Sequence, residues 1–347
     1  MSINLASKYA KSISARFQKE SYLAGNTCED FDFAGVRSIS IYTPLTVDLN
    51  DYDRTATANR FGTPVEMQDT IQEIELSQDK GFSITIDRGN NEDQMNVKGA
   101  AKMLKLQLKE KVVPFMDQYA LKRFTHLAGT VAGIDAPTKS TIVSAILDGA
   151  AVLDNAMVPD ADRILYIPTT YYNMLRQSSE FLAADIMAQK ALEKGLVGMV
   201  ADMRVIKVPD KYLPAGVYFL ITHKSSVLAP NKIKTARVLT NVMGIDGNVL
   251  EGRNYFDAFV LASKCDGVYA AVAGDKVCAA PVITSAGAIS STTPGAVLYY
   301  TTDGTDPRYS KTVKTGSTSD VTQSGTVVKA YAKKDDMFPS GVTSMTL

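Results

Sequence analysis

Two aspartates near the C-terminus have the types and spacing of ligand-binding residues. In the stretch YYTTDGTDPRYS, Asp303 and Asp306 flank a glycine and a threonine. Oxygens at this spacing suit a calcium loop, a glycan-binding corner or a tight turn between strands. An EF-hand needs a glutamate at position 12 of its loop, and that position counted from Asp303 is Lys314, so an EF-hand is excluded. We favour a strand and turn formed by Tyr300, Asp303, Gly304 and Asp306, with a looser calcium site as the alternative.

The rest of the chain offers no recognisable catalytic or metal-binding set. It has two histidines, His126 and His223, and no H-E-x-x-H, C-x-x-C, G-x-S-x-G or G-x-x-x-x-G-K-[ST] pattern. We interpret both histidines as structural. Paired carboxylates, which a glycosidase would need, are expected on the solvent faces of strands; they are Asp51 with Asp53 and Glu73 with Glu75. The sequence therefore predicts no catalytic, cofactor-binding or metal-binding residue, no cofactor and no enzymatic activity.

Composition limits the class of protein further. The chain has 347 residues, enough for two or three domains, with 37 basic and 37 acidic side chains. This balance provides no overall field that would favour nucleic acid or an acidic ligand. Three cysteines without metal-ligand spacing argue against a disulfide framework and fit a reducing compartment. No apolar run approaches the roughly 18 residues of a membrane span, and no signal peptide is expected, so we expect synthesis in the cytoplasm.

Apolar periodicity predicts the elements that position these groups. Residues 1–20 carry a stripe at every fourth position among several basic residues, which predicts a surface helix or an arm that packs on a neighbouring subunit or on a polyanion. Residues 71–87 alternate with period two around Asp79, Lys80 and Gly81, which predicts a β-hairpin with a glycine turn. The polar stretch DYDRTATANRFGTP between two β segments is long for a compact domain and therefore suggests contact with a partner.

A long helix is expected next. Apolar residues recur at spacings of three and four from Val97 to Tyr119, which places them on one helical face. Glu92 and Asp93 are expected in the first turn, where the helix dipole favours acidic residues. Pro114 is expected to kink or split this helix.

Two further regions follow the long helix. Helical and strand patterns alternate from about residue 138 to 230, which predicts a mixed α/β unit inserted into a platform of helix and sheet. From about residue 274, Ser, Thr, Gly and Val dominate and turn signals recur every 8–12 residues. This shift in composition predicts a separate small β-sandwich.

The order of these elements resembles the major capsid protein of tailed bacteriophages, with its Hong Kong 97-like fold. The resemblance covers about residues 1–275 and rests on LNDYDR…FGTPVEMQDTIQEIELSQDKGFSITIDRGNNED, the long helix, the inserted α/β unit and NYFDAFVLASKCDGVYA. It implies an α+β fold with these parts: an N-arm at 1–35, an extended E-loop region at 36–90, a P-domain at 91–130 and 231–275, and an A-domain at 131–230. The final segment, VLYYTTDGTDPRYS with GTVVKAYAKKDDMFPSGV, resembles small Ig-like modules and implies an all-β Ig-like sandwich at 279–347.

The resemblance also implies a function. Such a chain would assemble into hexamers and pentamers of an icosahedral phage head that encloses double-stranded DNA, with the Ig-like domain on the surface of the virion. The implied partners are further copies of the chain, scaffolding and portal proteins, DNA through non-specific contacts, and host-surface glycans at the Ig-like domain; no membrane is implied. Inter-subunit contacts are expected at Tyr52, Asp53, Arg54, Arg60, Phe61, Lys80, Phe82 and Arg88. The alternative is a secreted or surface carbohydrate-active enzyme or adhesin with a C-terminal Ig-like module, and a bacterial compartment shell would share the capsid fold.

Overall fold

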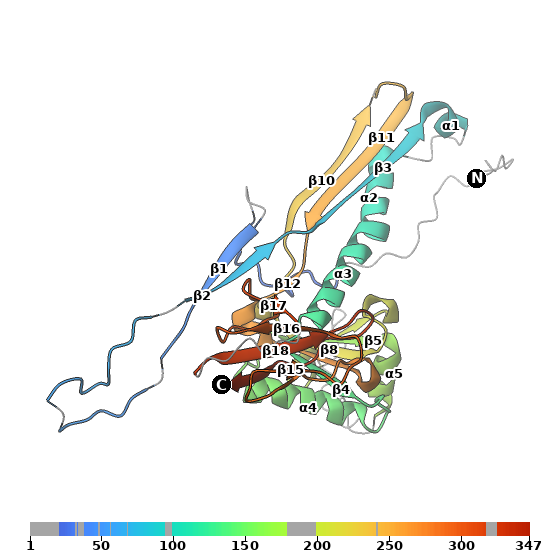
Figure 1. The fold of residues 1–347 in the computed structure, drawn as a ribbon. Helices are drawn as coiled ribbons and strands as arrows, with labels where there is room; N and C mark the ends of the chain where they lie inside the picture. The colour runs from blue at the N-terminus through green and yellow to red at the C-terminus, as the bar shows by residue number, and fades with distance from the viewer. Residues whose placement is uncertain are drawn as a thin grey trace. The chain divides into compact units, whose positions relative to one another are not determined.

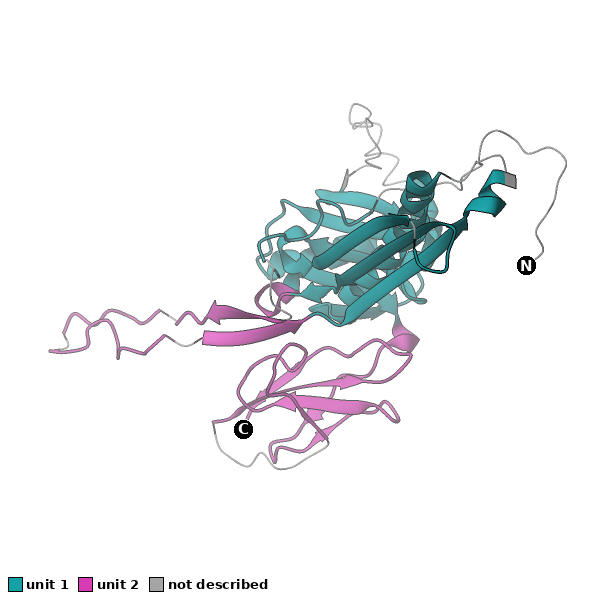
Figure 2. Cartoon of the chain, turned by 90° about the horizontal axis from the view of Figure 1, so that it is seen from above, with its two compact units in different colours: residues 1–35, 76–260, 266–273 teal, residues 36–75, 261–265, 274–347 magenta. Residues whose placement is uncertain are grey.

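Two units make up the computed structural model, whose elements are labelled in Figure 1 and whose units are coloured in Figure 2. Unit 1 comprises Met1–Gly35, Leu76–Val260 and Asp266–Ala273, and unit 2 comprises Val36–Glu75, Leu261–Cys265 and Gly274–Leu347. The structure describes residues 21–31, 33, 38–47, 49–55, 57–67, 69–93, 99–178, 199–240, 242–316 and 325–347. The helix predicted for residues 1–20 lies outside these ranges. No helix within them combines the length and apolarity that a membrane span requires.

A six-stranded mixed sheet forms the core of unit 1. Its order is β4-β13-β8-β5-β7-β6. The strands are β4 (Thr130–Ile134), β13 (Val268–Ala273), β8 (Val217–His223), β5 (Arg163–Pro168), β7 (Met203–Val208) and β6 (Met199–Val200). Parallel pairs join β13 to β4 and β5 to β7, and the other neighbours are antiparallel. Strands β5 and β8 are buried at every position, and their sequences, RILYIP and VYFLITH, are therefore mostly apolar without the alternation of a half-exposed strand.

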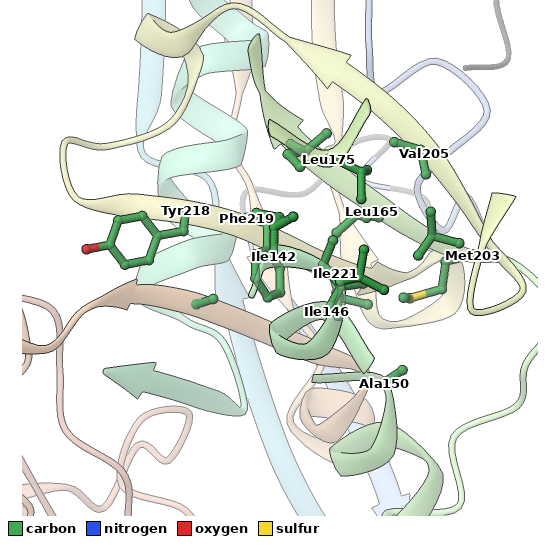
Figure 3. Packing of buried hydrophobic residues seen from close by; sticks show 14 of the residues in the cluster. Ile142, Ile146, Ala150, Leu165, Leu175, Met203, Val205, Tyr218, Phe219 and Ile221 are labelled. Atoms are coloured by element: carbon green, nitrogen blue, oxygen red, sulfur yellow. The ribbon is translucent and has the colours of Figure 1, made fainter. Parts of the chain in front are cut away.

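Helix packing completes this core. Helix α4 (Ile142–Asn155) directs Ile142 and Ile146 into the sheet, where both are fully buried. Helix α5 (Thr169–Gln177) contributes Leu175 to the same cluster. Figure 3 shows these side chains with Phe219 and Ile221 of β8. Each fully buried aliphatic or aromatic side chain of this kind stabilises the fold by about 1.5–3 kcal/mol.

Strand β13 joins this sheet from a distant part of the sequence. It lies between β4 and β8, although it follows residue 230, where the predicted A-domain ends; the domain bounds stay a prediction. Val268 is paired with Thr222, and Tyr269 is paired with Thr130. Apolar periodicity and composition are local properties, so they cannot reveal that β13 pairs with β4 and β8.

The long helix begins later than predicted. Asn90–Asp93 belong to a separate short helix, α1 (Arg88–Asp93), so the expected acidic opening of the long helix was wrong. Gly99 has an extended backbone, and α2 (Ala100–Gln107) begins after it. Helical backbone then continues through a π-helical turn (Leu108–Val112) into α3 (Val113–His126).

Pro114 marks the change from π to α geometry within this helix. In the π turn the N–H of Val113 donates to the carbonyl of Leu108, five residues earlier. Proline has no N–H to donate and fits the first turn of a helix, where α3 begins. The proline therefore interrupts the regular α-helix without ending it, and the 27 residues from Ala100 to His126 span about 40 Å at 1.5 Å per residue.

The hairpin predicted for residues 71–87 was wrong. Strand β3 (Gln78–Asp87) runs without a turn through Asp79, Lys80 and Gly81 and pairs along its whole length with β11 (Gly247–Phe256). Strand β10 (Asn231–Thr240) pairs with the other side of β11 to complete an antiparallel sheet. Gly81 permits a turn but does not require one. The backbone therefore stays extended there, because pairing with β11 along the whole of β3 is more favourable than a local hairpin turn.

Buried carboxylates tie segments of unit 1 to α3. Asp257 accepts hydrogen bonds from the backbone and hydroxyl of Ser77, at 2.9 and 2.7 Å, and from the Tyr119 hydroxyl at 2.8 Å. Asp117 accepts one from the Ser21 hydroxyl at 2.6 Å. Burial raises the pKa of Asp117, although its hydrogen bonds oppose this shift. A buried carboxylate is tolerated only when such donors satisfy it. Asp257 therefore links Ser77, just before β3, to Tyr119 of α3, and Asp117 of α3 holds the N-terminal segment at Ser21.

Unit 2 contains a strand ribbon and a small β module. The ribbon pairs β1 (Ser38–Pro44) with β2 (Asp69–Glu75) in antiparallel register. In the module, β17 (Lys314–Thr315), β16 (Val297–Thr301), β18 (Val327–Lys333) and β19 (Thr343–Thr346) form one sheet, and β14 (Val282–Ile283) pairs with β15 (Ile289–Ser290). The remaining short elements of the chain are β9 (Val227–Leu228), β12 (Phe259–Val260) and the 3-10 turns Asp210–Tyr212, Lys224–Ser226, Ala262–Gly267 and Gly274–Lys276.

Candidate functional site

The loop between β1 and β2, residues 45–67, has an ordered tip. The backbone N–H of Asp53 donates to the carbonyl of Arg60 at 3.1 Å, and the rings of Tyr52 and Phe61 meet edge to face with centroids 4.9 Å apart. The Asp53 carboxylate also accepts hydrogen bonds from the backbone and hydroxyl of Thr55, at 2.8 and 2.6 Å. These contacts shape the tip as a small hairpin within the long extended loop that leaves the ribbon in Figure 1.

Large apolar side chains on this loop and ribbon are exposed. Leu49 is 100% exposed and Phe61 is 81% exposed. Others exposed by 44–68% are Tyr42, Leu45, Val47, Tyr52, Val65, Met67 and Ile71. Scattered single apolar residues on a surface need no explanation, but a run of this kind along one extended segment indicates an interaction surface.

The structure brings five of the eight predicted contact residues together. Tyr52, Asp53, Arg54, Arg60 and Phe61 all lie in the loop tip, and Arg54 is exposed there.

The other three predicted contact residues lie on β3 and α1. Lys80 is exposed opposite Asn254, and Arg88 forms an ion pair with Glu92 at 3.3 Å. The ring of Phe82 lies over Gly252 of β11, so its described contact is within the subunit. The resemblance grouped these residues with the loop because the E-loop region that it implies extends from residue 36 to residue 90.

A groove of about 480 Å³ lies on one face of the β3–β11–β10 sheet. Gly81, Gly252 and Phe82 form part of its lining. Two exposed arginine–carboxylate pairs also line it: Arg253 donates to Asp79, with Nε at 2.9 Å from Oδ1, and Arg237 donates to Glu251. The hydrogen bond from Arg253 lowers the pKa of Asp79. Sequence reasoning missed the charged residues of β10 and β11, although their alternation along 231–256 was a usable signal.

The C-terminal turn uses its carboxylates internally. Asp303 accepts hydrogen bonds from the backbone of Thr305 at 3.0 Å and from the hydroxyl of Thr312 at 2.7 Å. Gly304, with a φ of 74°, supplies the left-handed backbone that the turn requires and donates its N–H to Val327. This arrangement is the turn that the sequence favoured over a calcium loop.

The second aspartate of this turn faces a cation that belongs to the chain. Asp306 accepts from Arg308, with Nη2 at 2.6 Å from Oδ2, and the Arg308 side chain is only 7% exposed. Tyr300 is buried in the core of the module. Among the described residues, no group of three or more histidine, cysteine or acidic side chains is arranged to hold a metal ion.

Both histidines have local structural contacts. The Nδ1 atom of His126 lies 2.8 Å from the carbonyl of Lys122, one helical turn earlier. The Nδ1 atom of His223 lies 2.9 Å from the hydroxyl of Ser225, and it accepts the backbone N–H of the same residue. These contacts agree with the structural role that the sequence suggested.

Comparison with known proteins identifies the fold. No family model matches the chain, and no curated protein matches its sequence. A capsid structure of Cyanophage P-SCSP1u matches with a TM-score of 0.63 at 15% identity, over 77% of this chain and 92% of that one. The mature capsid of bacteriophage PhiM1 matches with 0.58 at 11% identity, over 77% and 91%. A structure of Mycobacterium phage Che8 matches with 0.57 at 16% identity, over 77% and 96%.

The chain therefore has the α+β fold of phage capsid proteins, the Hong Kong 97-like fold that its sequence suggested. Nearly the whole length of each neighbour is matched, while about a quarter of this chain is not. The chain thus adds residues to the elements that these capsid structures share with it.

Proposed function

We propose that this chain is the major capsid protein of a tailed phage. In this proposal it assembles into hexamers and pentamers of an icosahedral head, encloses double-stranded DNA and has a structural rather than an enzymatic role. The observation that carries the proposal is the row of exposed apolar side chains along residues 45–67, in a chain with the fold of phage capsid proteins.

A loop with exposed apolar side chains is stabilised by a partner that covers them. Burial of apolar surface against a partner stabilises the complex by about 25 cal/mol for each Å² removed from water. Leu49 is 100% exposed, and Phe61 is 81% exposed despite its edge contact with Tyr52, so most of their apolar surface is uncovered within the described subunit. A second copy of the chain is the partner that a shell supplies, and head-to-tail contacts between copies would form the rings of hexamers and pentamers where the rotation between neighbours closes.

The remaining parts of the proposal follow from this role. Scaffolding and portal proteins would be further partners, and DNA would be contacted without sequence readout, through phosphates. The protein would be made in the host cytoplasm and located in the virion. The C-terminal module, proposed to be Ig-like, would lie on the outer surface. Glycan binding by that module stays a prediction; its stacked pair, Tyr299 and Tyr331 with centroids 5.2 Å apart, is only half-exposed.

Loop variants test the proposal. We expect Phe61→Asp and Leu49→Asp to abolish or strongly reduce assembly into shells, because each places a charge where apolar burial is required. Both residues are exposed, so the free energy of unfolding of the subunit should change by less than about 0.5 kcal/mol. Negative-stain electron microscopy and sedimentation measure assembly, and chemical denaturation measures stability.

Met157→Asp is the matched control for these variants. Met157 is 91% exposed and lies outside the loop, with a φ of 56° that aspartate tolerates well. It should assemble as the wild type does. Normal shells from both loop variants, or a wild-type chain that stays monomeric at high concentration, would overturn the proposal.

A further inference from the structure

Three segments that are distant in sequence meet in unit 2, around the base of the β1–β2 ribbon. They are β2, the segment Leu261–Cys265 and the turn 306–311 of the C-terminal module, all within the magenta unit of Figure 2. We propose that the turn 306–311 is an intramolecular docking surface that holds β2 and thereby fixes the direction of the loop 45–67 relative to the C-terminal module. This inference rests on the proposed function only for its consequence in assembly.

The ribbon needs such support. A two-stranded ribbon is marginally stable in water unless it packs against something else. Along β1, exposed and half-buried residues alternate and none is fully buried. In β2 only Ile74 is buried. Pairing between the strands cannot by itself fix the orientation of a ribbon with so little buried surface.

Direct contacts join β2 to the other two segments. The side chain of Gln72 accepts a hydrogen bond from the backbone N–H of Ala262 at 2.8 Å. The next residue, Glu73, forms an ion pair with Lys311 of the module, with 2.7 Å between Oε1 and Nζ. Glu73 is also paired with Ser40 of β1, so a contact that holds Glu73 acts on both strands.

The other side of the turn packs against Leu261–Cys265. Arg308 is held by Asp306 and its side chain is almost fully buried. Burial raises the pKa of Tyr309 well above its usual value, while the nearby Arg308 guanidinium opposes this shift; Cys265 contributes both a hydrogen bond and an electrostatic interaction that raise it. Residues 308 and 309 therefore belong to a closely packed contact rather than to a free surface, and Lys311 reaches the ribbon in an exposed ion pair.

Charge reversal tests the contact in the full-length, unassembled subunit. Hydrogen–deuterium exchange with mass spectrometry would follow the amides of residues 38–44 and 69–75. We expect Lys311→Glu and Glu73→Lys each to speed exchange there by about two- to five-fold, the range set by an exposed ion pair. The double variant, which restores opposite charges, should return exchange close to the wild-type rate. Lys314→Glu makes the same change of charge at an exposed position three residues away and should leave exchange unchanged.

The outcomes separate this inference from the proposed function. Unchanged exchange in both single variants, or no recovery in the double variant, would overturn the docking surface whether or not shells form. The expected exchange pattern in a chain that never forms shells would support the docking surface and reject the capsid role. If both hold, Lys311→Glu should also slow shell assembly, and the double variant should restore it.

Discussion

At the scale of single residues, the C-terminal turn shows how a ligand-like pattern can be satisfied within the chain. Asp303 and Asp306 have the spacing of a cation site, yet their oxygens accept hydrogen bonds from Thr305, Thr312 and Arg308. Desolvation raises the pKa of Asp303, but the hydrogen bonds from Thr305 and Thr312 together outweigh it and leave the pKa lowered. The carboxylate is therefore a structural acceptor in its ionised form.

This role predicts the effect of Asp303→Asn. The amide nitrogen can only donate to the Thr312 hydroxyl, and the carboxylate charge is lost, so we expect a loss of about 0.5–1 kcal/mol in the free energy of unfolding at pH 7, since charge-assisted hydrogen bonds are replaced by weaker neutral ones. A depressed folded pKa gives stability that is present above the unfolded pKa of about 4 and is lost as pH falls through the folded value. The difference between wild type and variant should therefore shrink below about pH 4.

Chemical denaturation at pH 7 and at pH 3 measures this difference. Asp335→Asn, at an exposed position in the same module, is the control and should have little effect at either pH. A difference that persists unchanged at pH 3 would show that the charge of Asp303 is not the cause.

At the scale of elements, continuous pairing decides the path of the chain after the ribbon. Strand β3 stays extended through Gly81 because β11 satisfies its ladder from Gln78 to Asp87. On β11, Gly252 has a packing role, since the ring of Phe82 occupies the space in which a side chain at that position would lie. A Cβ atom built at Gly252 would be 2.3 Å from the ring.

This packing predicts that Gly252→Ala destabilises the wild-type protein but not a variant that lacks the ring of Phe82. We expect Gly252→Ala to lower the free energy of unfolding by about 1 kcal/mol, because the ring of Phe82 must move. In a Phe82→Ala background the same change should be neutral or stabilising, because alanine suits a strand interior better than glycine does. A double-mutant cycle by chemical denaturation measures the coupling, and equal effects of Gly252→Ala in both backgrounds would contradict the packing argument.

At the scale of the whole molecule, each unit contains at least one buried cysteine, so the reactivity of the thiols measures how readily each unit opens. Cys28 lies in unit 1, and Cys265 and Cys278 lie in unit 2; none of the three forms a disulfide, and their exposures are 9%, 9% and 2%. Burial raises the pKa of Cys278, which lowers its thiolate fraction near neutral pH. A buried thiol is a poor nucleophile, because reactivity requires both access and the thiolate form.

We therefore expect slow reaction of all three thiols in the native subunit. Ellman's reagent at pH 8 should detect no rapidly reacting thiol in the native chain and three after denaturation. One rapidly reacting native thiol would show that the unit containing it opens more readily than its burial implies.

Much of the fold followed from local pattern. Period-two alternation identified β1, β2 and β3 as extended chain, and the spacing of apolar residues identified the helix that ends near His126. The order of elements suggested the Hong Kong 97-like fold, which the structural comparison confirms. The sequence also marked the stretch that forms the loop tip, because a long polar segment between strands predicts contact with a partner, and that contact stays a prediction.

Only the tertiary structure decided which distant segments pair. By itself the sequence determined the extended chain of β1 and β2, the helix around Pro114 and the turn at Gly304, because neighbouring residues set these conformations. It left open that β3 pairs with β11, that β13 joins the six-stranded sheet, and that the turn 306–311 contacts β2. The physical reason is that the pairings of β3 with β11 and of β13 with β4, and the contact of Lys311 with Glu73, join residues about 140 to 240 positions apart, where many alternative partners have the same local pattern and packing alone selects one.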